Sequence, residues 1–302
     1  MSYPFSRLDA SVVAHTLCPF LTYSDVVCFF NTSKGGRSIR EIVERQMFSR
    51  IPIFGKDCYQ RFWGVEITDR FEPQKIDIRI LRTFLKTYYG PNPVDPTKGV
   101  KSTCLFPTVI PKWMIVEGRG FDFNLNLLED IASHPRIGEN NASKYWDNPE
   151  DLEPIGENSL QEAHLAIILV GVIGRGDSWE AQVQRLRDLN ERTKYGCETE
   201  PDVLSITTAA FAVNAVRAER PFGDQTGLER RDTYSRTKEL VQWRQFKCHI
   251  MVGNFMKDHL GRPGPWGPLG PFGRYGPSEL FISRNCFCDT KAIGVAVQRN
   301  FG

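Results

Sequence analysis

The chain has 302 residues and 41% hydrophobic content, which suffices for one large core, or for one core and a small appended module. Its 38 Lys and Arg residues nearly balance 36 Asp and Glu residues, so the net charge does not favour nucleic acid and we expect no DNA or RNA partner. The longest apolar run, Leu165 to Ile173, is about half the length of a membrane span, and no export signal opens the sequence, so we expect a cytoplasmic protein without a membrane span.

Residues 8–48 hold three short apolar patterns that predict three helices. Pro19 interrupts the first pattern, where a kink or break is expected. Ser24 is predicted to cap the second helix, with the carboxylate of Asp25 near its positive end, and Ser38 with Glu41 predicts a capping box for the third. The first stripe comprises Leu8, Val12, Leu17, Phe20 and Leu21, and the third helix is predicted to bury Ile39, Ile42, Val43 and Met47.

A module of this length cannot close a core of its own, so we expect it to bury apolar surface against another protein or against the rest of the chain. Its pattern resembles an F-box, carried by Leu8, Val12, Leu17, Phe20-Leu21, Asp25-Val26 and Thr32-Ser33-Lys34. Asp9 stands where F-boxes usually have Pro, and Gly35-Gly36-Arg37 where they have Trp.

The resemblance implies that the module docks onto a Skp1-type adaptor, which joins F-box proteins to cullin–RING ubiquitin ligases. It also implies which side chains make that contact. These predicted partner-binding residues are Leu8, Val12, Leu17, Phe20, Leu21, Asp25, Val26 and Phe29.

The remaining pattern predicts an α+β protein, with a mostly helical connector at 51–100 and a mixed-sheet domain with packed helices at 101–302. Leu165 to Val170 is apolar at every residue, as in a strand covered on both faces, and is predicted to be the centre of the sheet. Other expected strands are an edge strand or hairpin at 104–116 and runs at 246–254, 279–284 and 292–298. Expected helices are one through Ile78, Leu81, Leu85 and Tyr88, one at 125–132, one capped by Ser178, and one at 207–220.

This body resembles uncharacterised F-box-like proteins of chlamydia-related bacteria that live inside amoebae, over nearly the full length. The resemblance implies no activity for the body. The stretches that carry it include Phe54-Gly55-Lys56, Leu125-Asn126-Leu127-Leu128, Lys144-Tyr145-Trp146, Arg220-Pro221-Phe222-Gly223, Asp232-Thr233-Tyr234-Ser235-Arg236 and Gly294-Val295-Ala296.

Glycine falls at every third position from Gly261 to Gly276, within a Gly/Pro-rich insertion at 261–277. A polyproline II segment with three residues per turn would gather large side chains on one edge, forming a possible second interaction surface. The alternative is a flexible loop inserted between two strands. The side chains of this edge are Trp266, Leu269, Phe272 and Tyr275.

The sequence contains no recognisable catalytic, metal or cofactor motif. Eight scattered cysteines favour a reducing compartment over a disulfide scaffold. Cys286-Phe287-Cys288 and Cys248-His249 lack zinc-site spacing, and no signature surrounds a cysteine nucleophile served by His164, His249 or His259. Gly171 to Gly176 follows a strand but matches no phosphate-loop motif, so we expect a turn there.

Three functions therefore remain open. The first is a bacterial effector that binds a host Skp1-type protein in the host cytosol and recruits a target for ubiquitination. The second is an enzyme of unknown activity in the C-terminal domain. The third is a structural protein whose N-terminal helices cap its own core.

Overall fold

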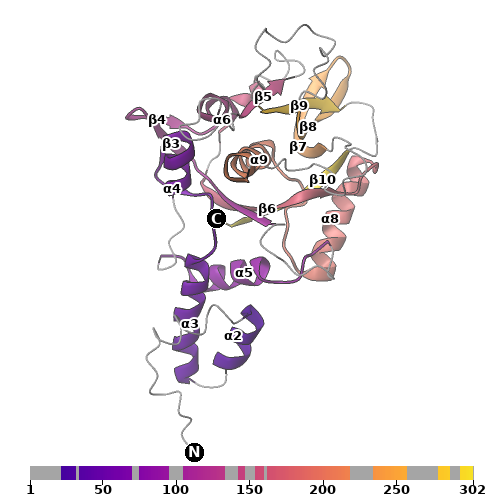
Figure 1. Cartoon of the computed structure of the whole chain (residues 1–302). Coiled ribbons are helices and arrows are strands. Elements are labelled where there is room, and N and C mark those ends of the chain that lie inside the picture. Colours follow the sequence, from indigo (N-terminus) through magenta and orange to yellow (C-terminus); the bar gives the residue numbers. More distant parts are fainter. Residues whose placement is uncertain are drawn as a thin grey trace, which may run out of the picture. The chain divides into compact units, whose positions relative to one another are not determined.

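The fold is α+β, as the sequence predicts, and it divides into two compact units (Figure 1). The computed structural model describes residues 22–31, 34–69, 75–94, 105–132, 142–146, 154–159, 162–217, 234–256, 278–285 and 293–301. The helical unit comprises Met1–Ile53 and Arg70–Leu105 with Phe301, and the sheet unit comprises Phe54–Asp69 and Phe106–Asn300 with Gly302. The connector expected at 51–100 is thus divided between the two units.

The described helices of the helical unit are α2 (Tyr23–Phe30), α3 (Lys34–Ser49) and α5 (Ile78–Tyr88). Helix α2 buries Tyr23, Val26 and Phe30, whose spacing places them on one stripe of the helix. That stripe packs on α3, and α3 in turn contacts α5. The first helix expected in the module, over residues 8–21, lies outside the described residues.

Two details of α3 differ from expectation. The helix begins at Lys34, so Ser38 and Glu41 lie within it and form no capping box. Its buried face includes Val43 and Met47, as predicted, but Ile42 is 44% exposed. The buried face is rotated relative to the predicted one, because the fully buried Glu44 lies at its centre. A charged residue does not contribute to an apolar pattern, so the sequence did not indicate this position.

The sheet unit is built on a seven-stranded mixed sheet with strand order β2-β6-β10-β7-β8-β9-β5. Strand β10 runs parallel to β7 and β5 parallel to β9, whereas β8 is antiparallel to both β7 and β9. The strands are β2 (Leu105–Ile110), β5 (Ala142–Trp146), β6 (His164–Ile173), β7 (Tyr234–Trp243), β8 (Phe246–Met256), β9 (Ser278–Asn285) and β10 (Ile293–Phe301).

The expected position of β6 was wrong. Residues Leu165 to Leu169 are buried on both faces, but β6 is second from the edge, and β7 occupies the middle. The sequence pattern did not predict β7 as a strand because most of its buried residues are polar: Ser235, Arg236 and Thr237, beside the apolar Val241. Strand β2 does lie at the sheet edge, where Pro107 is tolerated.

The two long helices of the sheet unit begin at side-chain caps. Ser178 caps α8 (Trp179–Thr193) as predicted, through a hydrogen bond from the backbone N–H of Ala181 to its hydroxyl. Helix α9 (Val203–Arg217) begins earlier than expected, because the Asp202 carboxylate accepts a hydrogen bond from the Ser205 N–H at 2.7 Å. The sheet and helix α6 (Leu125–Ala132) cover α9, so it is buried for most of its length.

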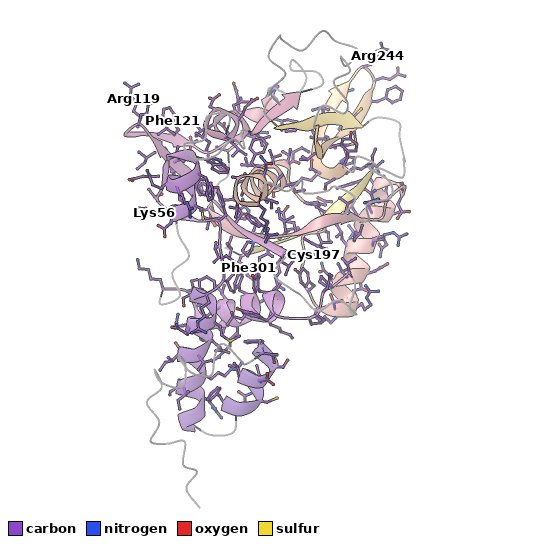
Figure 2. The ribbon with its side chains drawn as sticks, viewed as in Figure 1. Lys56, Arg119, Phe121, Cys197, Arg244 and Phe301 are labelled. Carbon is purple, nitrogen blue, oxygen red and sulfur yellow. The ribbon has the colours of Figure 1, made fainter. Side chains whose placement is uncertain are left out.

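A separate three-stranded sheet, with order β1-β3-β4, completes the sheet unit. Its strands are β1 (Glu66–Ile67), β3 (Trp113–Val116) and β4 (Arg119–Asp122), and two short helical segments, α4 (Lys56–Cys58) and η2 (Tyr59–Trp63), precede it. Every residue of β4 is exposed, and Figure 2 shows Arg119 and Phe121 on this strand.

Candidate functional site

The N-terminal end of α2 is closed by a capping box between Thr22 and Asp25. The backbone N–H of Asp25 donates to the Thr22 hydroxyl at 3.2 Å, and the backbone N–H of Thr22 donates to the Asp25 carboxylate at 2.8 Å. The Thr22 hydroxyl and N–H lower the pKa of Asp25. The cap is therefore Thr22 and not Ser24, and the carboxylate of Asp25, a predicted partner-binding residue, is engaged in fixing the helix start.

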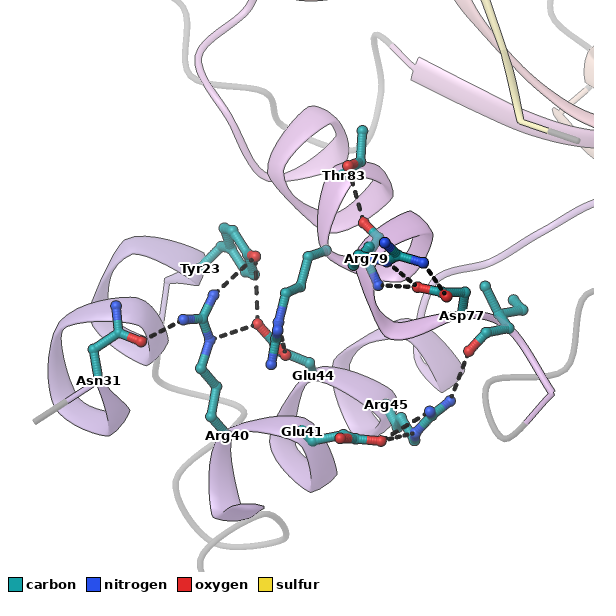
Figure 3. A network of polar contacts seen from close by, with 11 residues as sticks. Tyr23, Asn31, Arg40, Glu41, Glu44, Arg45, Asp77, Arg79 and Thr83 are labelled. Carbon is teal, nitrogen blue, oxygen red and sulfur yellow. Dashed lines mark hydrogen bonds and ion pairs between the residues drawn. The ribbon is translucent and has the colours of Figure 1, made fainter. Parts of the chain in front are cut away.

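A buried carboxylate joins the three helices of the helical unit (Figure 3). Glu44 of α3 has no exposed side-chain surface and pairs with two arginines. Arg40 Nε donates to its Oε1 at 2.7 Å and Arg82 Nε of α5 donates to its Oε2 at 2.8 Å. The Tyr23 hydroxyl of α2 lies 3.4 Å from Glu44 Oε1, and Arg40 also reaches Asn31 at the end of α2.

This network sets the orientation of the α2 stripe. The two arginines offset the cost of burying this carboxylate, since each of its oxygens receives a charge-assisted hydrogen bond. Burial and the nearby Glu44 raise the pKa of Tyr23, so its hydroxyl stays protonated and can donate. Helices α2, α3 and α5 are thus held as one body by polar as well as apolar contacts.

The structure places the predicted partner-binding residues in different environments. Val26 is fully buried against its own unit, so it supports the helix packing and is not exposed to a partner. Asp25 is half-buried, and the side chain of Phe29 is outside the described set. The uncovered side of α2 carries Ser24 and Cys28, with Val27 partly exposed. Leu8, Val12, Leu17, Phe20, Leu21, Trp266, Leu269, Phe272 and Tyr275 lie outside the described residues.

Of the two histidines that the structure describes, His164 makes the contact closer to catalytic geometry. Its Nε2 lies 3.0 Å from the Ser205 hydroxyl, and burial lowers its pKa, which keeps the ring neutral. The polar groups around this contact are those that satisfy the first turn of α9. Asp202 accepts from the Ser205 N–H and from the Gln298 amide at 2.9 Å, and Glu239 accepts from the Val203 N–H at 3.0 Å. Ser205 has no exposed surface, so the cluster chiefly satisfies the first turn of α9.

The second described histidine, His249, packs on Trp179 with ring centroids 4.1 Å apart, and its Nδ1 lies 2.9 Å from the Thr237 carbonyl oxygen. Its neighbour Cys248 is buried and disulfide-bonded, so it is neither a nucleophile nor a metal ligand. This disulfide differs from the reduced cysteines expected from the sequence. Within the described residues, no group of three or more His, Cys, Asp or Glu side chains could hold a metal ion.

Of the segment from Gly171 to Gly176, Gly174 to Gly176 form the expected turn, whereas Gly171 to Ile173 belong to β6. The Gly176 N–H donates to the Ile293 carbonyl at 3.0 Å, and the Gly174 carbonyl accepts from the Gln182 side-chain amide at 2.9 Å. Asp177 forms an ion pair with Arg185. These backbone groups hold α8 to β10, so they do not form a phosphate cradle.

The network of Tyr23, Arg40, Glu44 and Arg82 was not predicted from the sequence. The Arg40–Glu44 ion pair could have been predicted from the sequence, because residues four apart on a helix can pair. The ion pair of Glu44 with Arg82 could not have been predicted, since Arg82 belongs to another helix.

Comparison of the chain with family models, curated proteins and solved structures yields no match. In the part of the chain that the structure describes, no helix combines the length and apolarity needed to cross a membrane.

Proposed function

We propose that this chain is an F-box-like adaptor whose helical unit binds a Skp1-type protein and whose sheet unit recruits a target for ubiquitination. In this proposal the chain is a bacterial effector that acts in the host cytosol. The F-box resemblance of residues 8–34 motivates the choice of partner.

The main support is the two-sided character of α2. One side, with Tyr23, Val26 and Phe30, is buried within the chain, while Ser24 and Cys28 are exposed. A helix fixed in this way presents an ordered surface, which lowers the entropy cost of binding a partner. The predicted stripe from Leu8 to Leu21 would extend that surface.

Binding of purified Skp1-type protein to the full chain tests this proposal. We expect saturable binding by the wild type and loss of binding when Leu8→Asp and Phe20→Asp are combined. Leu240→Asp is the matched control, because Leu240 is 49% exposed in the sheet unit and should tolerate the same change. The proposal fails if the wild type does not bind, or if the folded double variant binds as tightly as the control.

A second candidate is an enzyme, favoured by the 3.0 Å contact between Ser205 Oγ and His164 Nε2. A neutral histidine beside a serine hydroxyl is the arrangement of a base and a nucleophile. A fluorophosphonate probe, which forms a covalent bond with activated serines, tests the enzyme candidate. Labelling of the wild type but not of Ser205→Ala would favour the enzyme, and an unlabelled wild type would remove it.

A further inference from the structure

One face of the small sheet of β1, β3 and β4 is buried at Ile67 and Met114 and exposed along β4, and the opposite face is mostly exposed. Cross-strand pairs assign the faces, because residues directly opposite each other point to the same side. Ile67 pairs with Met114, and both are fully buried. The opposite face carries Glu66, Trp113, Ile115, Gly120 and Asp122, through the pairs Glu66↔Ile115, Ile115↔Gly120 and Trp113↔Asp122.

Trp113 dominates the exposed face. Its side chain is 45% exposed, and its indole edge lies 4.0 Å from the position that a Cβ atom on Gly120 would occupy. The Trp113 ring therefore extends from β3 toward β4. Two exposed carboxylates, Glu66 and Asp122, share this face with the indole. An aromatic ring accompanied by carboxylates is suited to a cationic side chain.

Within the described part of the chain, strand β4 also has an open edge. It is the last strand in the order β1-β3-β4, and all four of its residues are exposed. The Phe123 N–H donates to the Lys112 carbonyl at 2.9 Å, so residue 123 faces β3. Because hydrogen-bonding direction alternates along a strand, residues 119 and 121 also face β3. The N–H and C=O groups of Gly120 and Asp122 then point to the open edge.

We propose that β4 binds an extended, basic peptide segment as an added antiparallel strand. The peptide backbone pairs with Gly120 and Asp122, and a Lys or Arg side chain lies opposite Asp122 and beside Trp113. On the other face, an apolar side chain lies opposite Phe121, which is 42% exposed, and an acidic one opposite Arg119. The preferred peptide therefore has four successive residues that are basic, apolar, of any kind, and acidic, in that order.

This inference goes beyond the adaptor proposal and does not depend on it, since the hairpin belongs to the sheet unit. In an adaptor, such an edge would recognise the target. A failure to bind Skp1-type protein leaves the peptide site standing, and a failure to bind peptide leaves the Skp1 proposal standing.

The test is fluorescence polarisation with the full chain and a labelled peptide that carries Lys-Val-Thr-Glu between Gly-Ser flanks. We expect saturable binding with a Kd below about 1 mM. Gly120→Pro should weaken binding by at least about fivefold, because it removes an N–H on the open edge and leaves the β3 pairing intact. Gly120→Ala is the matched control and should bind as the wild type does.

A charge exchange provides a second test that does not involve the backbone. Asp122→Lys should weaken binding of the Lys-Val-Thr-Glu peptide about fivefold and strengthen binding of Glu-Val-Thr-Glu by a similar factor. No saturable binding to the wild type would overturn the proposal. Equal affinities for Gly120→Pro and Gly120→Ala, or no response to the charge exchange, would also overturn it.

Discussion

Glu44 Oε2 accepts a hydrogen bond from Arg82 Nε at 2.8 Å, joining α3 to α5 across 38 residues of sequence. Because Glu44 is fully buried, its replacement leaves two arginines without their shared carboxylate. We predict that Glu44→Gln lowers the free energy of unfolding of the helical unit by about 2 kcal/mol. Urea denaturation followed by circular dichroism measures this change.

The same helix supplies the control for that experiment. Glu41 pairs with Arg45 at 2.9 Å at the same i,i+4 spacing, but its side chain is 44% exposed. Glu41→Gln should change the free energy of unfolding by less than about 0.5 kcal/mol. Equal effects of the two substitutions would show that the Glu44 network does not hold the helices together.

The capping box makes a prediction about two adjacent hydroxyl residues. Thr22→Ala should destabilise α2 by about 1 kcal/mol, because the Asp25 N–H loses its acceptor. Ser24→Ala should have no measurable effect, since Ser24 is exposed and does not cap the helix. Hydrogen exchange of the α2 amides compares the two variants, and faster exchange in Ser24→Ala alone would contradict the assignment.

Acidification should destabilise the sheet unit through His164. Burial lowers the pKa of His164 in the folded chain below its usual 6.5, so the unfolded chain takes up the proton first. This contribution to stability is present above pH 6.5 and is lost as the pH falls toward the folded pKa. The nearby Asp202 carboxylate opposes the pKa shift and Lys238 adds to it, but neither reverses its direction.

We therefore predict that the urea midpoint of the wild type falls more between pH 7.5 and pH 5.5 than that of His164→Gln. The carboxyls of Glu198 and Glu239 have pKa values raised by burial and act in the opposite sense. They are present in both proteins, so their contribution cancels in the comparison. A parallel fall in the two midpoints would contradict the prediction.

Two glycines should respond differently to a methyl group. A Cβ atom on Gly294 of β10 would lie 2.6 Å from the Ile173 carbonyl oxygen and 2.9 Å from Val172 Cβ, so the strands would have to separate. We predict that Gly294→Ala costs about 2 kcal/mol of stability. Gly120→Ala meets only the Trp113 ring at 4.0 Å and should be neutral. Thermal unfolding distinguishes the two variants.

Elements with a clear apolar period and a local cap could be predicted from the sequence. Helix α5 follows from Ile78, Leu81, Leu85 and Tyr88, and α8 follows from its Ser178 cap. These signals are local, since periodicity and capping depend on residues within one or two turns.

The parts that depend on distant residues could not be predicted. Arg236 reads as a surface residue, but in β7 its side chain is buried and donates to the Asp177 carbonyl at 2.9 Å. Strand order is also non-local, so the apolar run of β6 revealed its burial but not its place in the sheet. The open edge at Gly120 became visible only once β4 was paired with β3.

Protection of Cys28 by a partner tests the adaptor account most directly. Cys28 is a free, exposed thiol on the uncovered side of α2, whereas burial raises the pKa of Cys197 to about 11 and also raises the pKa of Cys58. Peptide-level mass spectrometry after brief alkylation reads each thiol separately. We predict that saturating Skp1-type protein slows alkylation of Cys28 at least about tenfold and leaves Cys58 unchanged. An unchanged rate at Cys28 in a chain that binds Skp1-type protein would contradict the proposed interface.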